Sequence, residues 1–399
     1  MVFRKARTAV FHIEDDRLRG IEGEAAQRVG RSLLSEGDKI PDIFEVDRDK
    51  PFKIGDLHKY RGYDIFAFIT GTLFITSDGI NVLSKTALNR KGLSVIVPVS
   101  NESLILFQRF VPPFIYQTKS VFKWVADQIY GKFGDDVTDA DEVDDFCLVF
   151  RRELLKGLPA DRDLVDLPQI VKRGKYKFGV AKGVYAHRYR NVYESGREDL
   201  LLHVPLKAGK ILDIGCAKGL FGELLKKRQR CIVTGIDTDP ELIDVAKGRL
   251  DNVICGDIGA IINGGALGVY NCIVCGDLIE HLDNPWKVVK ELKDHLKKRG
   301  LFIASTPNIM NWAILFDLLR GRWDYVPFSI LSGTHIRFFT RNTLIELFEG
   351  AGYRIRKVLL QDIEIPPPGL EFIANLKNVS PGVSDEELKA SEIVIVAER

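Results

Sequence analysis

Short apolar runs and amphipathic stretches alternate along most of this chain of 399 residues. Apolar runs of a few residues between turn-forming residues are typical of buried strands, whereas apolar positions three or four residues apart are typical of helices. In the C-terminal half the pattern predicts strands at 210–214, 231–236, 253–255, 270–275, 301–305, 353–360 and 392–397, and helices at 220–227, 240–249, 286–298 and 343–351. This alternation indicates a Rossmann-like α/β domain with a mostly parallel sheet of seven strands.

The N-terminal half shows a similar but less regular alternation. Its apolar runs predict strands at 6–13, 42–46, 63–69, 93–99 and 143–150, and a helix at 22–34. The acidic segment 135–145 is predicted to be an exposed loop. A polar stretch at 190–209 separates the halves, so we expect two α/β domains, at residues 1–192 and 193–399.

Composition narrows the function classes. The net charge of +2 gives no basic field that would favour nucleic acid, and no apolar run is long enough to span a bilayer. The N-terminus lacks the apolar core of a signal peptide, and six scattered cysteines fit a reducing cytoplasm, where we expect the protein to act. Cys272 and Cys275 form a C-x-x-C pattern, but strand alternation would place them on opposite faces, so we predict core cysteines and no metal in this half.

Acidic residues end the predicted strands of the C-terminal half. The first strand ends at Asp213 and is followed by a turn with Gly215 and Gly219, where the backbone can approach a ligand closely. The second ends at Asp237, 22 residues after Gly215, a spacing suited to hydrogen bonds with both ribose hydroxyls. The carboxyl ends of parallel strands meet at one sheet edge, where ligands bind.

Two more strands end in Gly-Asp, at Asp257 and Asp277, and residues 280–285 read E-H-L-D-N-P. In this order and spacing the four motifs resemble class I methyltransferases that use S-adenosylmethionine, in the small-molecule branch whose fourth motif reads E-H-L-x-N-P. The resemblance covers about 200 residues. It implies a cofactor site made of the residues Asp213, Gly215, Cys216, Gly219, Asp237, Thr238, Asp257, Ile258 and Asp277.

The same resemblance implies that Glu280 and His281 lie beside the transferred methyl group and the acceptor. Ala217 stands where the family usually has glycine, from which we expect a more crowded loop and weaker cofactor binding at most. A structural alternative is a nucleotide-type fold that binds nothing, in which Asp213 merely caps the next helix.

An insert near residues 308–340 resembles the acceptor lid of methyltransferases from bacterial polysaccharide and lipopolysaccharide pathways. Aromatic faces suit sugar rings and an arginine suits an anionic group, so the candidates for acceptor binding are Trp312, Trp323, Tyr325 and Arg337. Core packing of the aromatic residues is an equal alternative. His281 and His335 are candidates for a general base toward a hydroxyl, although a purely structural role for either stays open.

The motif order of the N-terminal half resembles the latter part of inverting, GT-A-type family 2 glycosyltransferases. The resemblance implies that Asp78 lies in the metal region, that Asp163 is a base and that His187 is the late histidine. Residues 77–79 read S-D-G rather than D-x-D, and the usual opening motifs are absent. We therefore expect a degenerate sugar-binding or scaffolding domain, with a divalent metal only if that domain is active.

Taken together, these features predict methylation of a sugar or glycan intermediate of surface polysaccharide biosynthesis. Two alternatives are a bifunctional glycosyltransferase–methyltransferase and a non-catalytic glycan-assembly scaffold with a cofactor-binding fold. The expected partner is a small-molecule or glycan acceptor, and the oligomeric state is left open.

Overall fold

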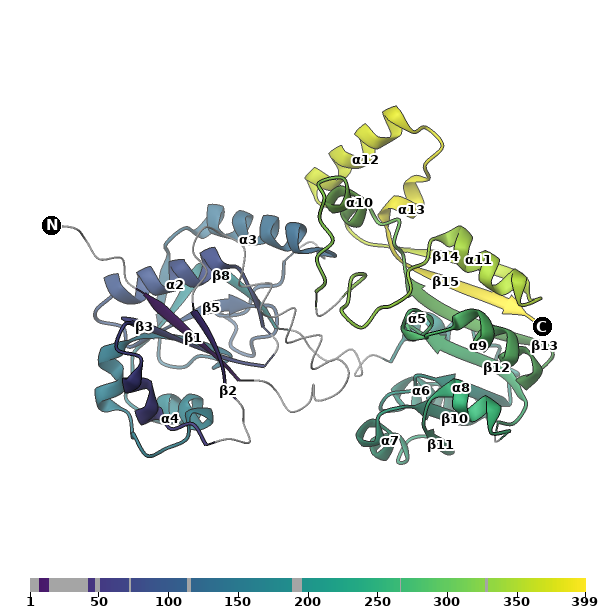
Figure 1. Cartoon of the computed structure of the whole chain (residues 1–399), viewed down its shortest axis with the longest axis horizontal. Coiled ribbons are helices and arrows are strands. Elements are labelled where there is room, and N and C mark those ends of the chain that lie inside the picture. Colours follow the sequence, from purple (N-terminus) through teal and green to yellow (C-terminus); the bar gives the residue numbers. More distant parts are fainter. Residues whose placement is uncertain are drawn as a thin grey trace. The chain divides into compact units, whose positions relative to one another are not determined.

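The computed structural model describes residues 7–13, 42–46, 51–71, 73–112, 116–188, 196–265, 267–326 and 329–399. The chain divides into two compact units, one of residues 1–189 with 324–328 and one of residues 190–323 with 329–399 (Figure 1). The helix predicted at 22–34 lies outside the described residues, as does the 190–195 part of the predicted junction.

The second unit is built on a seven-stranded sheet in the order β11-β10-β9-β12-β13-β15-β14. Its strands are β9 (Lys210–Ile214), β10 (Ile232–Asp237), β11 (Asn252–Cys255), β12 (Tyr270–Gly276), β13 (Leu296–Pro307), β14 (Arg354–Asp362) and β15 (Ala390–Glu398). The first five strands of this order pair in parallel, whereas β15 is antiparallel to both of its neighbours. The prediction of a Rossmann-like, mostly parallel sheet is therefore confirmed.

The strand order reverses its direction between β9 and β12. From β9 the chain moves outward to β10 and β11, and it then returns to place β12 on the other side of β9. Crossovers leave such a switch point in opposite directions, which opens a crevice at the carboxyl ends of the two strands. This is the edge of the sheet that carries the acidic strand ends.

Helices cover both faces of this sheet. They are α5 (Glu198–Leu201), α6 (Leu220–Arg228), α7 (Pro240–Ala246), α8 (Ile258–Asn263), α9 (Pro285–Leu292), α10 (Trp312–Leu318), α11 (Arg341–Gly350), α12 (Pro367–Val379) and α13 (Asp385–Lys389), with short 3-10 turns η6 (Ile279–His281) and η7 (Lys293–His295). Alternate residues of β12 enter two separate cores, so Cys272 packs in one and Cys275 in the other. Both are buried free thiols, which confirms that they are core residues.

Three predicted boundaries in this unit are wrong. The helix predicted at 286–298 ends at Leu292, and β13 already begins at Leu296. We predicted a helix over the basic run 297–299 because lysine favours helices. In the structure this run belongs to β13 and lies where the pairing of β12 with β13 shifts register, between Tyr270 and Cys272. Helix α7 ends at Ala246 rather than 249, and α5, α8, α12 and α13 were not predicted.

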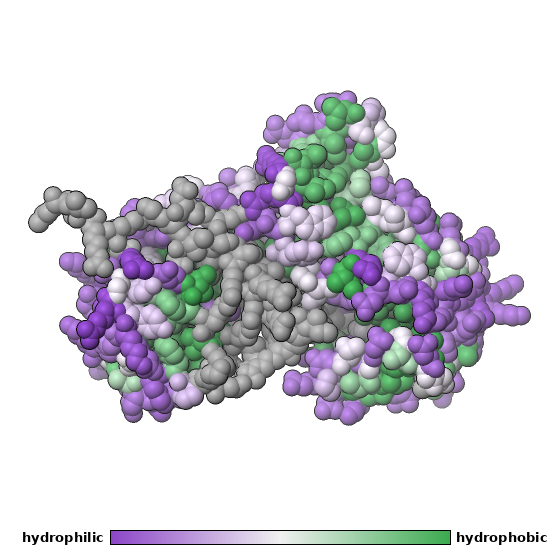
Figure 2. All heavy atoms as spheres, viewed as in Figure 1, coloured by the Kyte–Doolittle hydropathy of each residue, from purple (hydrophilic) through white to green (hydrophobic). Residues whose placement is uncertain are grey.

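Helices α10 and α12 pack together through Phe316 and Phe372, whose ring centroids lie 5.4 Å apart. The outer surface of this helical pair stays partly apolar, as Figure 2 shows at the top of the view. Leu319 is 72% exposed and Leu370 is 51% exposed. An apolar surface of this kind is available for contact with another molecule.

The first unit holds a mixed sheet in the order β2-β1-β3-β7-β5-β8-β4, with β6 paired to β8. Its strands are β1 (Thr8–Ile13), β2 (Asp42–Val46), β3 (Ile65–Thr70), β4 (Leu73–Ile75), β5 (Val95–Ser100), β6 (Val137–Ala140), β7 (Cys147–Arg151) and β8 (Phe178–Arg188). Its helices and 3-10 turns are η2 (Ile54–Lys59), α2 (Ser77–Asn89), α3 (Lys119–Phe133), η3 (Arg152–Gly157), η4 (Leu164–Asp166) and α4 (Leu167–Arg173). An α/β fold is confirmed for this unit.

One expectation fails in this unit. Strand β6 lies inside the segment 135–145, which was predicted to be an exposed loop. Its side chains Thr138 and Asp139 are exposed, and it is held by backbone pairing with β8, so its sequence carries no apolar signal. Among the described residues of the whole chain, no helix has the length and apolar character needed to cross a membrane.

Candidate active site

The glycine loop between β9 and α6 has the conformation that its sequence demands. Gly215 and Gly219 both have φ of +77°, in the left-handed region that favours glycine. The backbone N–H groups of Gly215 and Cys216 donate to the Ile236 carbonyl at 2.8 and 3.0 Å, which ties the loop to β10. The Cys216 side chain is buried in the core, so this residue could contact a ligand only through its backbone.

Asp213 is 4% exposed, and its Oδ2 atom has no hydrogen-bond partner among the described residues. Burial, and next the negative charge of Asp237, raise the pKa of the Asp213 carboxyl to about 7. No side chain caps α6, so the capping alternative for Asp213 is wrong. A buried carboxyl without a partner is costly and marks a position where a ligand donates. This atom therefore fits the amino group of S-adenosylmethionine.

Asp237 ends β10 and is held by two backbone groups. Its Oδ2 accepts from Ala217 N at 2.8 Å and its Oδ1 accepts from Asp239 N at 3.0 Å. Each carboxylate oxygen keeps a second acceptor position, which suits the two hydroxyls of a ribose. Thr238 follows as an exposed residue at the same edge.

Ala217, which departs from the family's glycine, has φ of +46°. The left-handed conformation costs a residue with a Cβ about 1 kcal/mol. The expected crowding of the loop is thus a strain of the backbone, and the hydrogen bond to Asp237 offsets part of it.

Asp257 lies at the next strand end and caps α8, because its Oδ1 accepts from Ala260 N at 2.9 Å. The neighbouring Ile258 is 4% exposed. Gly256 N donates to the Asp237 carbonyl at 2.8 Å, so the ends of β10 and β11 are fixed to each other. The structure thus places Asp257 and Ile258 at the same sheet edge as Asp237, with helix capping as the visible role of Asp257.

Asp277 follows β12 and has φ of +49°. It belongs to an ionic network that was not predicted from the sequence. Its carboxylate accepts from Ser305 Oγ at 2.8 Å and forms an ion pair with Arg197. Arg197 also pairs with Asp199 and with Glu392, whose pKa is raised to about 8 by burial and next by Asp277. The only sequence signal for Arg197 was its place among charged residues just before α5.

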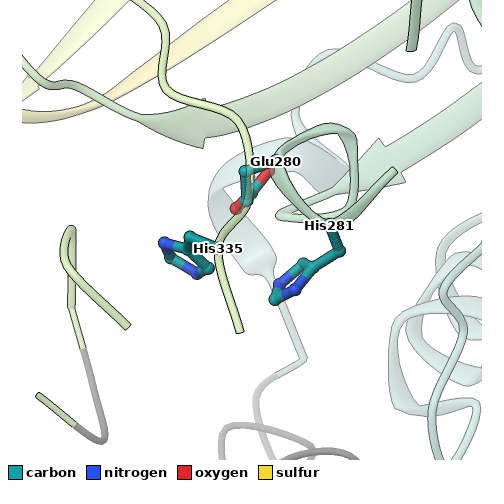
Figure 3. Close-up of side chains that lie close together, drawn as sticks. All are labelled: Glu280, His281 and His335. Atoms are coloured by element: carbon teal, nitrogen blue, oxygen red, sulfur yellow. The ribbon is translucent and has the colours of Figure 1, made fainter. Parts of the chain in front are cut away.

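Glu280, His281 and His335 come together below this edge, as Figure 3 shows. Glu280 is 1% exposed, and neither of its carboxyl oxygens has a hydrogen-bond partner among the described residues. Burial, and next Asp277, raise the pKa of Glu280 well above its usual range. Burial lowers the pKa of His281, and it lowers that of His335 to about 4, so both imidazoles are neutral near pH 7.

The two histidines are oriented by backbone carbonyls. His281 Nδ1 lies 3.1 Å from the Thr334 carbonyl oxygen, and His335 Nδ1 lies 2.9 Å from that of Ile330. Their ring centroids are 4.8 Å apart and their planes meet at 82°. The fold thus brings together two histidines that lie 54 residues apart in the sequence and that were predicted only as separate candidates for a general base.

The segment that carries His335 is fixed to η6 by its backbone. The N–H groups of Ile336 and Arg337 both donate to the Glu280 carbonyl at 3.0 Å. The Arg337 guanidinium donates to the carbonyls of Ile336 and Asp283. Arg337 therefore helps to hold this segment, in addition to its proposed role toward an anionic acceptor.

The aromatic candidates for acceptor binding differ from one another. Trp312 is 3% exposed and packs beside Phe316, so core packing is its role and it offers no free face to a sugar ring. Trp323 is 36% exposed and contacts Phe338 edge-on, with ring centroids 5.2 Å apart. Tyr325 is 43% exposed. Trp323 thus remains available for contact with an acceptor, whereas Tyr325 belongs to the first compact unit.

Comparisons with known proteins bear on this half of the chain. Residues 185–358 match the family model described as a methyltransferase domain. A Coxiella burnetii protein named "Ubiquinone biosynthesis O-methyltransferase" is 31% identical over 160 residues, which is 38% of this chain and 66% of that protein. A Xylella fastidiosa protein of the same name is 34% identical over 137 residues, which is 33% of this chain and 54% of the relative. The chain spans just under two thirds of the first of these relatives and about half of the second.

Among solved structures, a SAM-dependent methyltransferase from Archaeoglobus fulgidus aligns with 51% of this chain and 91% of its own chain, with 18% identity and a TM-score of 0.38. The matched family segment includes the glycine loop, the acidic strand ends and the buried histidine pair. Residues 185–358 of the chain are therefore a methyltransferase domain.

Proposed function

We propose that this chain is an O-methyltransferase that transfers the methyl group of S-adenosylmethionine to a hydroxyl of a small or glycan-type acceptor. The observation that carries the proposal is the buried Oδ2 of Asp213, which has no hydrogen-bond partner among the described residues, beside the carboxylate of Asp237, whose two oxygens are each held by a backbone N–H group. The relatives named O-methyltransferases support oxygen as the atom that receives the methyl group.

In such a reaction, bound S-adenosylmethionine supplies an electrophilic methyl group on a cationic sulfur. An oxygen lone pair of the acceptor forms the new O–CH3 bond while the S–CH3 bond breaks, and its electron pair remains on sulfur. The acceptor also loses its O–H proton. The Glu280–His281–His335 cluster is the proposed place where this proton is handled, and a neutral imidazole of His281 or His335 can accept it.

The acceptor class rests on fewer observations. The partly exposed ring of Trp323 supports our prediction of a sugar or glycan intermediate of surface polysaccharide biosynthesis. The names of the relatives favour a second candidate, an acceptor from ubiquinone biosynthesis. The apolar surface of α10 and α12 favours an acceptor with an apolar part in either case.

For the N-terminal unit we propose a glycosyltransferase-like domain with a binding or scaffolding role. Its candidate acids are engaged in ion pairs, Asp78 with Lys123 at 3.3 Å and Asp163 with Lys53 at 2.8 Å. A nucleotide-sugar titration in the presence of Mn²⁺ tests this proposal. Micromolar binding would favour the bifunctional alternative instead.

The methyltransferase proposal is tested by incubating the purified full chain with S-adenosylmethionine carrying a labelled methyl group and with panels of glycans and of phenolic acceptors. Label in an acceptor is the expected result. Binding of the cofactor without transfer to any hydroxyl acceptor would favour the scaffold alternative. Acceptors that differ only in which hydroxyl is blocked then identify the methylated atom.

A further inference from the structure

The Glu280–His281–His335 cluster combines three groups that can all act as electron-pair donors. One possible ligand atom from each residue lies within 4.8 Å of the other two. Both carboxyl oxygens of Glu280 are buried and have no hydrogen-bond partner among the described residues. A buried carboxylate is normally paired with a cation or bound to a metal.

The hydrogen bonds of the two histidines fix which nitrogen carries the proton. A carbonyl oxygen can only accept, so Nδ1 of His281 and Nδ1 of His335 must each donate, to Thr334 and Ile330 respectively. In a neutral ring this leaves Nε2 with a free lone pair. A metal-binding histidine commonly has this arrangement, with its second nitrogen donating to a carbonyl or carboxylate.

We propose that Glu280, His281 and His335 hold one divalent metal ion. We predicted no metal in this half, because the sequence shows neither a second C-x-x-C motif nor paired histidines. The fold brings His335 close to Glu280 and His281, which local motifs do not show. Two imidazoles and one carboxylate favour a transition-metal ion such as Zn²⁺, Mn²⁺ or Fe²⁺ over Mg²⁺ or Ca²⁺.

Three protein ligands leave coordination positions open for water or substrate. This part of the inference rests on the proposed function: an acceptor hydroxyl that occupies an open position would lose its proton more readily, because the cation stabilises the oxygen anion. The cluster would then act as a ligand set that positions and activates the acceptor oxygen; the released proton would pass to solvent water, and neither histidine would serve as the base itself.

The position of the cluster agrees with this role. Glu280 and His281 form the turn η6 shortly after β12, and the Glu280 carbonyl anchors the backbone of the His335 segment. The ligands therefore come from two segments whose relative position is fixed before any ion arrives. Such preorganisation favours a defined binding geometry over an adventitious surface contact.

The test measures metal binding directly. The purified full chain is treated with a chelator, desalted and titrated calorimetrically with ZnCl₂, MnCl₂ and MgCl₂, each alone. The same titrations use Glu280→Gln and His335→Ala, and His295→Ala serves as the control, since His295 bonds the Gly268 carbonyl outside the cluster. Thermal unfolding of each variant shows whether it is folded.

We expect about one equivalent of Zn²⁺ or Mn²⁺ to bind the wild type and His295→Ala, with affinity at least 10-fold weaker in the two cluster variants. The metal should also raise the unfolding temperature of the wild type. Absence of binding to the wild type at millimolar metal, or equal binding in His335→Ala, would overturn the proposal. The wild-type titration tests the proposal by itself, so a variant that fails to fold does not rescue the proposal.

A parallel titration separates this inference from the proposed function. The metal-free chain should still bind S-adenosylmethionine, because Asp213 and Asp237 are not part of the cluster, while methyl transfer should return only when metal is restored. Full transfer in the chelator-treated chain would refute the metal role and leave a histidine base in its place. Metal binding without any methyl transfer would instead count against the proposed function.

Discussion

Two candidate acids of the N-terminal unit differ in their partners from Asp213 and Asp237 of the C-terminal unit. In the N-terminal unit, Asp78 and Asp163 form ion pairs with lysines. Among the described residues of the C-terminal unit, Oδ2 of Asp213 is buried without a hydrogen-bond partner, and Asp237 accepts from the backbone N–H groups of Ala217 and Asp239. A carboxylate in an ion pair with a lysine stabilises the local structure, whereas a carboxylate without a cationic partner in the protein can accept hydrogen bonds from a ligand.

The histidines show the same contrast. His187 in the N-terminal unit bonds to the hydroxyls of Tyr116 and Tyr185, and burial lowers its pKa to about 4. His281 and His335 use one nitrogen on a backbone carbonyl and lie beside an unpartnered carboxyl. Hydrogen-bond partners, rather than burial or pKa, therefore distinguish His187 from the two histidines that we propose as functional.

The largest expected effect tests this contrast at the histidines. His335→Ala should lower the rate of methyl transfer by at least about 100-fold, because it removes a group that handles the acceptor proton, either directly or through a metal. Cofactor affinity should stay unchanged. His187→Ala is the matched variant in the other unit and should leave transfer unaffected; equal losses in both variants would remove the distinction. Single-turnover assays and cofactor titrations provide both readouts.

A pH titration of the ligand-free chain tests the unpartnered carboxyl of Asp213. Its pKa of about 7 in the folded chain exceeds the value of about 4 for an unfolded aspartate, so the folded state binds the extra proton. The stability that this proton contributes is complete below pH 4 and is lost as the pH rises through 7. Urea unfolding should show a decrease of about 2 to 4 kcal/mol across this range that is absent in Asp213→Asn.

The same variant links stability to binding. At pH 8, Asp213→Asn should be more stable than the wild type but should bind S-adenosylmethionine about 10-fold more weakly, since one charge-assisted hydrogen bond is lost. Asp244→Asn is a suitable control, because Asp244 pairs with Lys247 on the surface. A variant with unchanged affinity would show that Asp213 does not contact the cofactor.

A smaller effect is expected from the loop. Ala217→Gly removes the cost of a left-handed alanine, about 1 kcal/mol, while keeping the backbone bond to Asp237. Because the glycine variant is also more flexible when unfolded, we expect an unfolding free energy within about 1 kcal/mol of the wild type. Cofactor affinity should rise a few-fold at most. A marked fall in affinity, measured by calorimetry, would contradict the strain that we assign to Ala217.

The smallest effect belongs to the N-terminal unit. Asp78→Asn removes an exposed ion pair with Lys123 and should change stability by less than about 1 kcal/mol. Methyl transfer should stay at the wild-type rate. A clear loss of transfer would mean that this acid has a role in the reaction and that the two units do not differ as described.

Much of the cofactor edge could be predicted because its residues follow directly after strands. The spacing along the chain brings Asp213, Asp237, Asp257 and Asp277 to consecutive strand ends, and a parallel sheet aligns such ends. Strand β6 escaped prediction because an edge strand can be held by backbone pairing alone, without apolar side chains. The basic run at the start of β13 similarly looked like the end of a helix.

Contacts between distant segments could not be predicted from local patterns. The ion pairs of Arg197 with Asp277 and Glu392 join three separate segments of the chain. The burial of Trp312 depends on how α10 packs against α12, and this decided between stacking and core packing. The hydrogen bond of His281 to the Thr334 carbonyl likewise depends on a tertiary contact, so the residue types alone could not predict the proposed metal site.

The most direct test of the central claim is an isothermal titration of S-adenosylmethionine into the full chain, with Asp237→Ala alongside. We predict saturable one-to-one binding to the wild type and a loss of about 100-fold in the variant, because two hydrogen bonds from a charged acceptor to the ribose disappear. Equal affinity of both proteins, or no binding to the wild type, would contradict the account of the cofactor edge.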